Sequence, residues 1–331
     1  MSPLVAVTGA DGFIGSHLVE ALVRRGHRVR AMAQYTSSGT WGWLDSLPAE
    51  TVADVDVRPG DIRDSGCVLD FMRDVECVYH LAALIAIPWS YQAPRSYVDT
   101  NISGTLNVLE AARTLGTPRV VHTSTSETYG TAQTVPISET HPLQGQSPYA
   151  ATKIAADKLA ESYHLSFETP VATVRPFNTY GPRQSARAII PTVISQIAAG
   201  SRQIMLGALE PTRDFNYVAD TVSAFIAVGE SAGGSVEGHV FNAGSGHEIS
   251  IKDLVQTIAR VMNREVDVTQ DPRRIRPSGS EVMRLVCDSQ RLSDATGWRK
   301  QVDLETGLRL TSEWFIKPEN LSFYKPGLYN V

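Results

Sequence analysis

A tyrosine and a lysine stand four residues apart in this sequence, at Tyr149 and Lys153, and together they could transfer a proton. They follow Ser147-Pro148 and lie among apolar residues at helical spacing, so we expect both side chains on one face of a helix. A free phenol is a poor base at neutral pH because its pKa is about 10, but a nearby ammonium favours the phenolate. The same spacing is common on ordinary helices, where it means only a surface tyrosine beside a solvated lysine. The surrounding motifs therefore decide between the two interpretations.

Thr125, Ser126 and Glu127 form a second group of reactive side chains. They come shortly after Val120, Val121 and His122, which we predict to be the end of a buried strand. Side chains that follow such a strand emerge at the carboxyl edge of a parallel sheet, where open sheets bind their ligands. Hydroxyl groups that bind an oxygen, and a carboxylate that accepts a proton, are therefore expected at this edge.

Three glycines lie between a short apolar run at 4–7 and a predicted helix that contains Leu18 and Leu22. A strand, a glycine turn and a helix start in this order form a pyrophosphate cradle. The first glycine permits the tight turn, the second lets the backbone approach the phosphates, and the third lets helix and strand pack closely. The predicted cradle comprises Gly9, Gly12, Phe13, Ile14 and Gly15.

Composition limits the class of protein. A chain of 331 residues is long enough for roughly two domains, or one large domain with a lobe. A formal net charge of -5 without a basic stripe argues against nucleic acid as a partner, and no stretch approaches the roughly 20 apolar residues of a membrane span. The amino terminus lacks the basic prelude of a signal peptide, and three scattered cysteines indicate neither a disulfide framework nor a metal site. We therefore expect a protein of the reducing cytoplasm, with no metal and no membrane partner.

Apolar runs alternate with helical segments up to about residue 176, which predicts an α/β fold with a doubly wound parallel sheet of the Rossmann type. Beyond Phe177 the alternation loosens, and proline and arginine accumulate. We expect residues 1–176 to form the dinucleotide-binding domain, with a return segment near 214–243. Residues 177–213 and 244–331 should form a smaller C-terminal lobe that binds the substrate.

These motifs resemble, over nearly the whole chain, the extended short-chain dehydrogenase/reductase superfamily, and in particular its members that modify nucleotide sugars. The resemblance implies that Tyr149 is the base or acid acting on a sugar hydroxyl and that Thr125 hydrogen-bonds the reacting oxygen. It also implies that Lys153 lowers the pKa of the tyrosine and holds the nicotinamide ribose. By the same resemblance, Asn101 supports the site from its helix.

The resemblance also assigns residues to a dinucleotide. Asp61 and Ile62 would meet the adenine, and Leu81, Ala82 and Ala83 would form a small-residue turn beside the ribose and phosphates. The segment 34–38, Gln-Tyr-Thr-Ser-Ser, follows the second predicted strand. It holds neither the acid that binds the adenine ribose of NAD nor an arginine for a 2'-phosphate. We favour NAD as the cofactor, and NADP stays open.

For the substrate, the resemblance points to residues that clasp a nucleotide diphosphate. Guanidinium groups suit this ligand because they bind phosphate oxygens in pairs. An Ile-Pro pair at 190–191 resembles the stretch beside the base. The residues expected to bind a UDP-, GDP- or dTDP-linked sugar are Asn178, Arg187, Ile190, Pro191, Arg213 and Arg276.

The residues that follow Thr125 separate the reactions of this superfamily, whose members first oxidise the sugar at C4. A 4-ketone acidifies the C5 proton, and Glu127 would remove it, so that water is lost across C5 and C6 and hydride returns to C6. The resemblance thus favours an NAD-dependent nucleotide-sugar 4,6-dehydratase, a lyase that makes a 4-keto-6-deoxy-hexose or N-acetylhexosamine. Many dehydratases of deoxythymidine-linked glucose carry Asp-Glu here, whereas this chain has Ser126-Glu127, as in GDP-mannose dehydratases and UDP-glucuronate decarboxylases.

The nearest overall likeness is to the N-acetylhexosamine dehydratases of legionaminic-acid-type pathways, through segments 41–44, 141–149, 176–187 and 324–331. A nucleotide-sugar 4-epimerase or a UDP-glucuronate decarboxylase is the alternative, and a non-catalytic dinucleotide sensor is a remote one. Relatives pair through two helices that here would span Asn101 to Arg113 and Tyr149 to Tyr163, which implies a homodimer.

Overall fold

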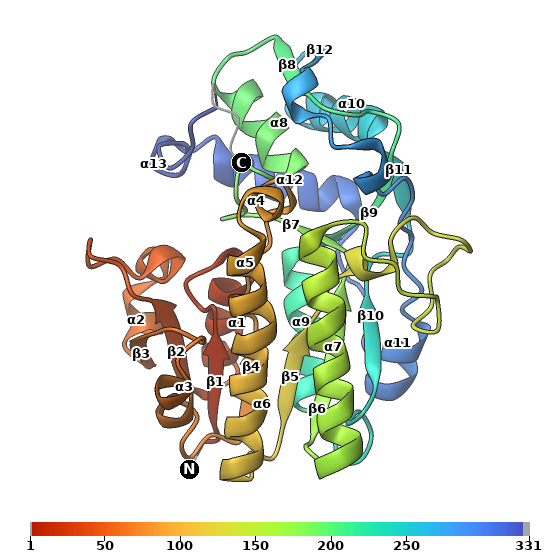
Figure 1. The fold of residues 1–331 in the computed structure, drawn as a ribbon. Coiled ribbons are helices and arrows are strands. Elements are labelled where there is room, and N and C mark those ends of the chain that lie inside the picture. The colour runs from red at the N-terminus through yellow and green to blue at the C-terminus, as the bar shows by residue number, and fades with distance from the viewer. Residues whose placement is uncertain (1, 327–331) are drawn as a thin grey trace.

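A seven-stranded sheet runs through the larger part of the computed structural model, which describes residues 2–326 (Figure 1). Neighbouring strands are parallel throughout, in the order β10-β6-β5-β4-β1-β2-β3, so the direction of winding reverses between β1 and β4. Ligands of open parallel sheets bind at such a switch point. The prediction of a doubly wound parallel sheet is confirmed. Its strands are β1 (Leu4–Thr8), β2 (Arg28–Gln34), β3 (Val55–Gly60), β4 (Cys77–His80), β5 (Val120–Thr123), β6 (Val171–Pro176) and β10 (Val240–Ala243).

Helices cover both faces of the sheet (Figure 1). On one face Leu18, Leu22 and Phe225 are fully buried in a shared core, and on the other Val68 and Val108 belong to a second core. Because both faces are covered, the strands are nearly continuous apolar runs. The first face carries α1 (Phe13–Arg24) and α9 (Val218–Gly229), with α11 (Gln290–Thr296) beside α9, and the second carries α3 (Ser65–Phe71), α6 (Gly104–Leu115) and α7 (Pro148–Phe167).

A smaller layer lies beyond the carboxyl ends of the strands and has its own apolar core, with Ile194, Leu254 and Leu308 fully buried (Figure 1). It contains β7 (Asn178–Tyr180), β8 (Gln203–Leu206), β9 (Thr212–Tyr217), β11 (Glu248–Ser250), β12 (Asp267–Gln270), α8 (Ile189–Ala198), α10 (Ile251–Val261), α12 (Leu304–Phe315) and α13 (Pro318–Leu321). β9 pairs with β7 and β11, and β8 pairs with β12.

The chain leaves the large sheet after β6 and returns to it at β10, whose Val240 lies opposite Thr173. The return segment expected near 214–243 requires such a pairing with the large sheet. The domain boundaries themselves stay a prediction. Residues 327–331, which belong to the predicted lobe and to the 324–331 likeness, lie outside the described residues. No helix of the described chain is long and apolar enough to cross a membrane.

Short helical segments lie in the connections between the main strands and helices. The helix expected over Asn101 to Arg113 begins earlier, at Pro94, and residues 98–103 form a π-helical stretch that contains Asn101. Such stretches often occur at functional sites. These connecting segments are η1 (Gly42–Ser46), α2 (Ala49–Val52), α4 (Ile87–Gln92), α5 (Pro94–Tyr97), η2 (Val98–Ser103), η3 (Ser126–Tyr129), η4 (Pro272–Arg274) and η5 (Ser278–Ser280).

Two glycines allow β1, α1 and the loop after β4 to approach one another closely. Gly9 has a φ of 66°, and a Cβ there would lie 2.8 Å from the backbone nitrogen of Ala82. A Cβ on Gly15 would lie 2.1 Å from the carbonyl oxygen of Gly9. Both obstacles are backbone atoms, so neither can move without displacing the turn.

We expect Gly15→Ala to destabilise the protein even though alanine normally favours a helix over glycine by up to about 1 kcal/mol. The clash with the backbone should outweigh that gain, with a net loss of roughly 1–3 kcal/mol in the free energy of unfolding, measured in urea. Gly233→Ala is the matched control, because nothing lies within 4 Å of a Cβ at Gly233. Equal stability of the two variants would show that the turn adapts.

Candidate active site

The carboxyl end of β5 brings the two predicted groups of reactive side chains together. Thr125 follows β5, and its Oγ1 accepts a hydrogen bond from the Glu127 backbone nitrogen at 3.2 Å, which caps η3. Ser126 begins this turn and is buried. Ser147 caps α7 through the Ala150 nitrogen at 3.1 Å.

Tyr149 and Lys153 are buried on the same helix. Burial raises the pKa of Tyr149, the hydrogen bond with the Thr125 hydroxyl partly opposes the rise, and the charge of Glu127 adds to it. Burial lowers the pKa of Lys153 to about 8, against the charge of Asp157, and the Lys153 Nζ donates to the Thr123 carbonyl oxygen at 2.5 Å. The shift of the Tyr149 pKa is thus opposite to the one expected of a base. Its lowering by Lys153 stays a prediction for the protein with its ligands bound.

The charge of Glu127 acts both on α7 and on the smaller layer. Its charge acts on Tyr149, and it also opposes the effect of burial on Arg213, whose pKa is lowered. Among residues 2–326, no hydrogen bond or ion pair reaches the Glu127 carboxylate. This carboxylate is therefore free to accept a proton between Tyr149 and Arg213.

Two of the predicted substrate arginines converge on one carboxylate. Arg213 is 7% exposed and its Nη2 lies 3.0 Å from Oε1 of Glu281, while Nη1 of Arg276 lies 3.8 Å from the same oxygen. Glu281 thus joins the two cations. A ligand with several phosphate oxygens would find both guanidinium groups in one place.

The other predicted substrate residues are Asn178, Arg187, Ile190 and Pro191. Asn178 donates from Nδ2 to the Asp214 carbonyl oxygen at 3.3 Å. Arg187 is exposed and donates to Ser185 Oγ at 3.2 Å. Ile190 and Pro191 are buried in the first turn of α8. Their contact with a nucleotide stays a prediction.

The glycine loop has the form of an anion cradle. Gly12 is exposed, and a Cβ there would meet only the Gly9 carbonyl oxygen, at 3.3 Å. It precedes α1 without a side-chain cap, so the first N–H groups of α1, beginning with those of Phe13 and Ile14, have no side-chain partner at the cap. Unpaired N–H groups at a helix amino terminus bind phosphate. The residues present therefore fit the pyrophosphate of a dinucleotide.

The turn after β4 lies against this cradle. Leu81 and Ala82 donate their backbone N–H groups to Thr8 Oγ1, both at 3.1 Å, and Ala83 continues the turn. The Asn101 amide donates to the Leu84 carbonyl oxygen at 2.9 Å and to Thr152 Oγ1 at 3.0 Å. Asn101 therefore fastens the turn to α7, in keeping with its expected supporting position.

On the predicted adenosine side, Asp61 is held by Arg63, whose Nη2 lies 2.5 Å from Oδ2, and this pairing lowers the pKa of Asp61. Ile62 is buried at 5% exposure. Its contact with adenine stays a prediction. An acid missed by the sequence reasoning does reach the end of β2. Asp11, from the glycine loop, accepts a hydrogen bond at Oδ2 from the Gln34 nitrogen at 3.2 Å. The only sequence signal was its place inside the glycine motif.

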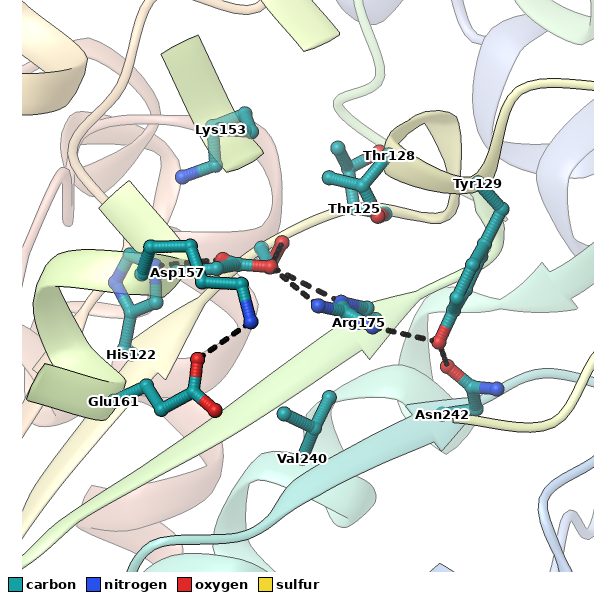
Figure 2. A network of polar contacts seen from close by, with 12 residues as sticks. His122, Thr125, Thr128, Tyr129, Lys153, Asp157, Glu161, Arg175, Val240 and Asn242 are labelled. Carbon is teal, nitrogen blue, oxygen red and sulfur yellow. Dashed lines mark hydrogen bonds and ion pairs between the residues drawn. The ribbon is translucent and has the colours of Figure 1, made fainter. Parts of the chain in front are cut away.

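A chain of buried polar residues runs from α7 to β6 and η3, and it was also missed by the sequence prediction. Asp157, Arg175 and Tyr129 form a connected chain of contacts there (Figure 2). Asp157 could have been found, because it follows Lys153 by one helical turn. His80 is buried between the hydroxyls of Thr8 and Thr105. In the described part of the chain no group of His, Cys, Asp and Glu side chains could hold a metal ion.

The parallel sheet, the glycine cradle and the pair Tyr149 and Lys153 together are typical of enzymes that bind a dinucleotide. Comparison with known proteins identifies the family. The family model of GDP-mannose 4,6 dehydratase matches residues 6–311. The chain belongs to this family, within the extended short-chain dehydrogenase/reductase superfamily of NAD-dependent nucleotide-sugar dehydratases, epimerases and decarboxylases. The superfamily prediction is confirmed.

Individual relatives differ in their reactions. A UDP-glucose 4-epimerase of Mycolicibacterium smegmatis is 35% identical, covering 93% of this chain and 97% of its own. A UDP-N-acetyl-alpha-D-glucosaminuronate decarboxylase of Bacillus cytotoxicus is 32% identical, covering 95% and 98%. The structure of DesIV, a dTDP-glucose 4,6-dehydratase of Streptomyces venezuelae with NAD and TYD bound, superposes with a TM-score of 0.86 at 27% identity, covering 98% and 99%.

Burial of Lys153 gives a pH prediction. Its pKa is about 8 in the folded protein, against an ordinary value of 10.5, so the unfolded chain binds more protons between these pH values and stability should rise with pH across them. Removing the charge in Lys153→Met should stabilise the protein relative to wild type near pH 7, by roughly 1–3 kcal/mol, and the difference should shrink near pH 10. Urea unfolding of both proteins at the two pH values measures it.

The matched control is Lys158→Met, on the same helix, because the Lys158 ammonium is exposed and pairs with Glu161 at the surface. Its stability difference should change little with pH. If the stability difference between Lys153→Met and wild type is equally independent of pH, this contradicts the placement of a charged Lys153 ammonium in a buried site.

Proposed function

We propose that this protein is an NAD-dependent nucleotide-sugar 4,6-dehydratase, a lyase that makes an NDP-4-keto-6-deoxy sugar. The observation that carries the proposal is the Glu127 carboxylate. It lies close enough to Tyr149 to raise the pKa of the phenol, and no hydrogen bond or ion pair from residues 2–326 occupies it. A carboxylate with this freedom beside the oxidising residues suits a base that acts on the carbon next to C4.

In the first step Tyr149 accepts the proton of the C4 hydroxyl, while Thr125 hydrogen-bonds the same oxygen. When bound, NAD would take the hydride from C4 and give it back at C6. The Lys153 ammonium favours the phenolate and holds the nicotinamide ribose. Gly9, Gly12 and Gly15, with the first N–H groups of α1, would hold the pyrophosphate.

In the second step Glu127 accepts the C5 proton, which the new C4 ketone has acidified. The electron pair of that C–H bond forms the C5–C6 double bond, and the C6 hydroxyl leaves with a proton as water. A proton then returns to C5, completing the 4-keto-6-deoxy sugar. Of the two protons removed, one leaves in water and one returns to the sugar, so the reaction is balanced.

The substrate would enter with its diphosphate on Arg213 and Arg276. Both guanidinium groups now share Glu281, and phosphate oxygens would compete for the same donors. Arg187, Asn178, Ile190 and Pro191 are proposed to complete the nucleotide site in the lobe. The nucleotide can be UDP, GDP or dTDP, and an N-acetylhexosamine is the sugar that the legionaminic-type likeness favours.

NAD is favoured over NADP by the Asp11 carboxylate beside the Gln34 nitrogen. An acid at this edge suits a ribose hydroxyl and repels a 2'-phosphate. The structurally similar dehydratase DesIV holds NAD.

A 4-epimerase is the second candidate, because the relative of 35% identity carries that name. An epimerase returns the hydride to C4 and needs no base at C5, so Glu127 would then have no part in the reaction. A decarboxylase would need a carboxylate at C6 of the substrate. The mass of the product separates the three reactions.

Glu127→Gln and Tyr149→Phe test the proposal as a pair. The amide of Glu127→Gln cannot accept the C5 proton, so C4 oxidation should continue while water loss falls by at least about a hundredfold, and reduced cofactor and 4-keto sugar should accumulate. Tyr149→Phe should block C4 oxidation itself, so that neither accumulates. Absorbance of reduced cofactor and mass spectrometry of the sugar report both steps with a panel of UDP-, GDP- and dTDP-sugars. Glu127→Gln that dehydrates as fast as wild type moves the assignment to the epimerase.

We also propose a homodimer formed through α6 and α7, which pack side by side on one face of the sheet (Figure 1). Leu165 and Phe167 at the end of α7 are 75% and 52% exposed, which favours a partner there. Light scattering should give twice the mass of one chain for wild type and for the control Tyr35→Arg, and one mass for Leu165→Arg. A wild-type monomer at micromolar concentration refutes the dimer.

A further inference from the structure

Asp157, Arg175 and Tyr129, which we call the buried clamp, connect the segments that carry the reactive side chains (Figure 2). Asp157 is 4% exposed and lies four residues after Lys153 on α7. Its carboxylate accepts hydrogen bonds from Ser124 Oγ at 2.8 Å and from Arg175 Nη2 at 2.8 Å, and His122 Nε2 lies 3.2 Å away. These contacts thereby join α7 to the ends of β5 and β6.

The clamp continues from Arg175 to the far end of η3. Arg175 Nη1 donates to the Tyr129 hydroxyl at 2.9 Å, and that hydroxyl donates to Asn242 Oδ1 on β10 at 2.8 Å. The guanidinium carbon also lies 4.9 Å from the centre of the Tyr129 ring. Tyr129 is fully buried, so both hydrogen-bonding roles of its hydroxyl are filled inside the protein.

Glu127 lies on the four-residue turn η3, between two tied ends. At one end Ser124, which precedes Thr125, is held by Asp157, and at the other end Tyr129 is held by Arg175. Thr128 Oγ1 closes the turn by donating to the Thr125 carbonyl oxygen at 2.7 Å. No partner among residues 2–326 holds the Glu127 carboxylate itself, so the backbone of this turn sets its position.

We propose that the buried clamp is a positioning unit that holds Glu127 at a fixed position relative to Tyr149. Both ties of the turn lead to Asp157, on the helix that carries Tyr149 and Lys153, through charge-assisted hydrogen bonds in a dry interior. The two halves have separate effects. The Asp157–Ser124 contact holds α7 to the Thr125 end, where C4 is oxidised, and the Arg175–Tyr129 contact holds the end that places Glu127 for proton removal at C5. This inference rests on the proposed dehydratase function.

Tyr129→Phe breaks only the second half, because the ring stays and the hydroxyl is lost. C4 oxidation should stay within about threefold of wild type, while water loss should slow by between about tenfold and about a hundredfold, the range expected when a reacting group is displaced by up to roughly 1 Å. Single-turnover measurements give the ratio of reduced cofactor to dehydrated product, and this ratio should rise. Thr128→Val, which is isosteric and loosens the same turn, should raise the ratio in the same direction and serves if Tyr129→Phe does not fold.

Tyr180→Phe is the matched control. Tyr180 is also fully buried, and its hydroxyl donates one hydrogen bond, to the Leu304 carbonyl oxygen at 3.1 Å in the smaller layer. The substitution removes this hydrogen bond. A purely structural effect would destabilise Tyr129→Phe and Tyr180→Phe alike and leave the ratio unchanged in both. An unchanged ratio in Tyr129→Phe and Thr128→Val overturns the positioning unit while wild-type dehydration stands. A wild-type enzyme that never releases water overturns the proposed function, and with it the role of the clamp.

Discussion

A buried carboxylate, that of Asp157, is the interaction on which the rest of the site depends. Burial alone would raise its pKa, yet the hydrogen bond with His122 and the charge of Arg175 lower it to about 2. A carboxylate that stays charged in a dry interior must keep its partners, since loss of one partner of a buried ion pair costs about 3–5 kcal/mol. These contacts therefore fix α7, β5 and β6 to one another beside the segments that carry Thr125, Tyr149 and Lys153.

This arrangement lets a protein with an ordinary apolar core hold groups that prefer water. Lys153 is buried, but the charge of Asp157 limits the fall of its pKa, which stays at about 8. The smaller layer contributes positive charge, because Arg213 and Arg276 meet at Glu281 and Arg213 lies close enough to Glu127 for the two charges to interact. The proposed oxidation at C4 and proton removal at C5 would then need no rearrangement of the sheet, only side chains already placed at its carboxyl edge.

Local sequence signals predicted much of this structure. The glycine spacing, the Ser147 cap and the apolar runs are properties of neighbouring residues, and the strands, the cradle and the shared face of Tyr149 and Lys153 followed from them. Contacts between distant residues could not be predicted in the same way. Asp11 meets Gln34 across 23 positions, and Arg175 meets Tyr129 across 46, with no periodic pattern to mark either. The direction of the Tyr149 pKa shift also depends on burial that spacing does not report.

The proposed dehydration requires that a proton leaves C5 of the sugar and that a proton exchangeable with solvent returns there. The most direct measurement is turnover by the wild-type enzyme in deuterated water, followed by mass spectrometry and NMR of the sugar product. One deuterium should appear at C5 and none at C6, because the hydride delivered to C6 comes from C4 and never exchanges with solvent. A product that carries no deuterium at C5, or a product of unchanged mass with inverted C4, contradicts the account.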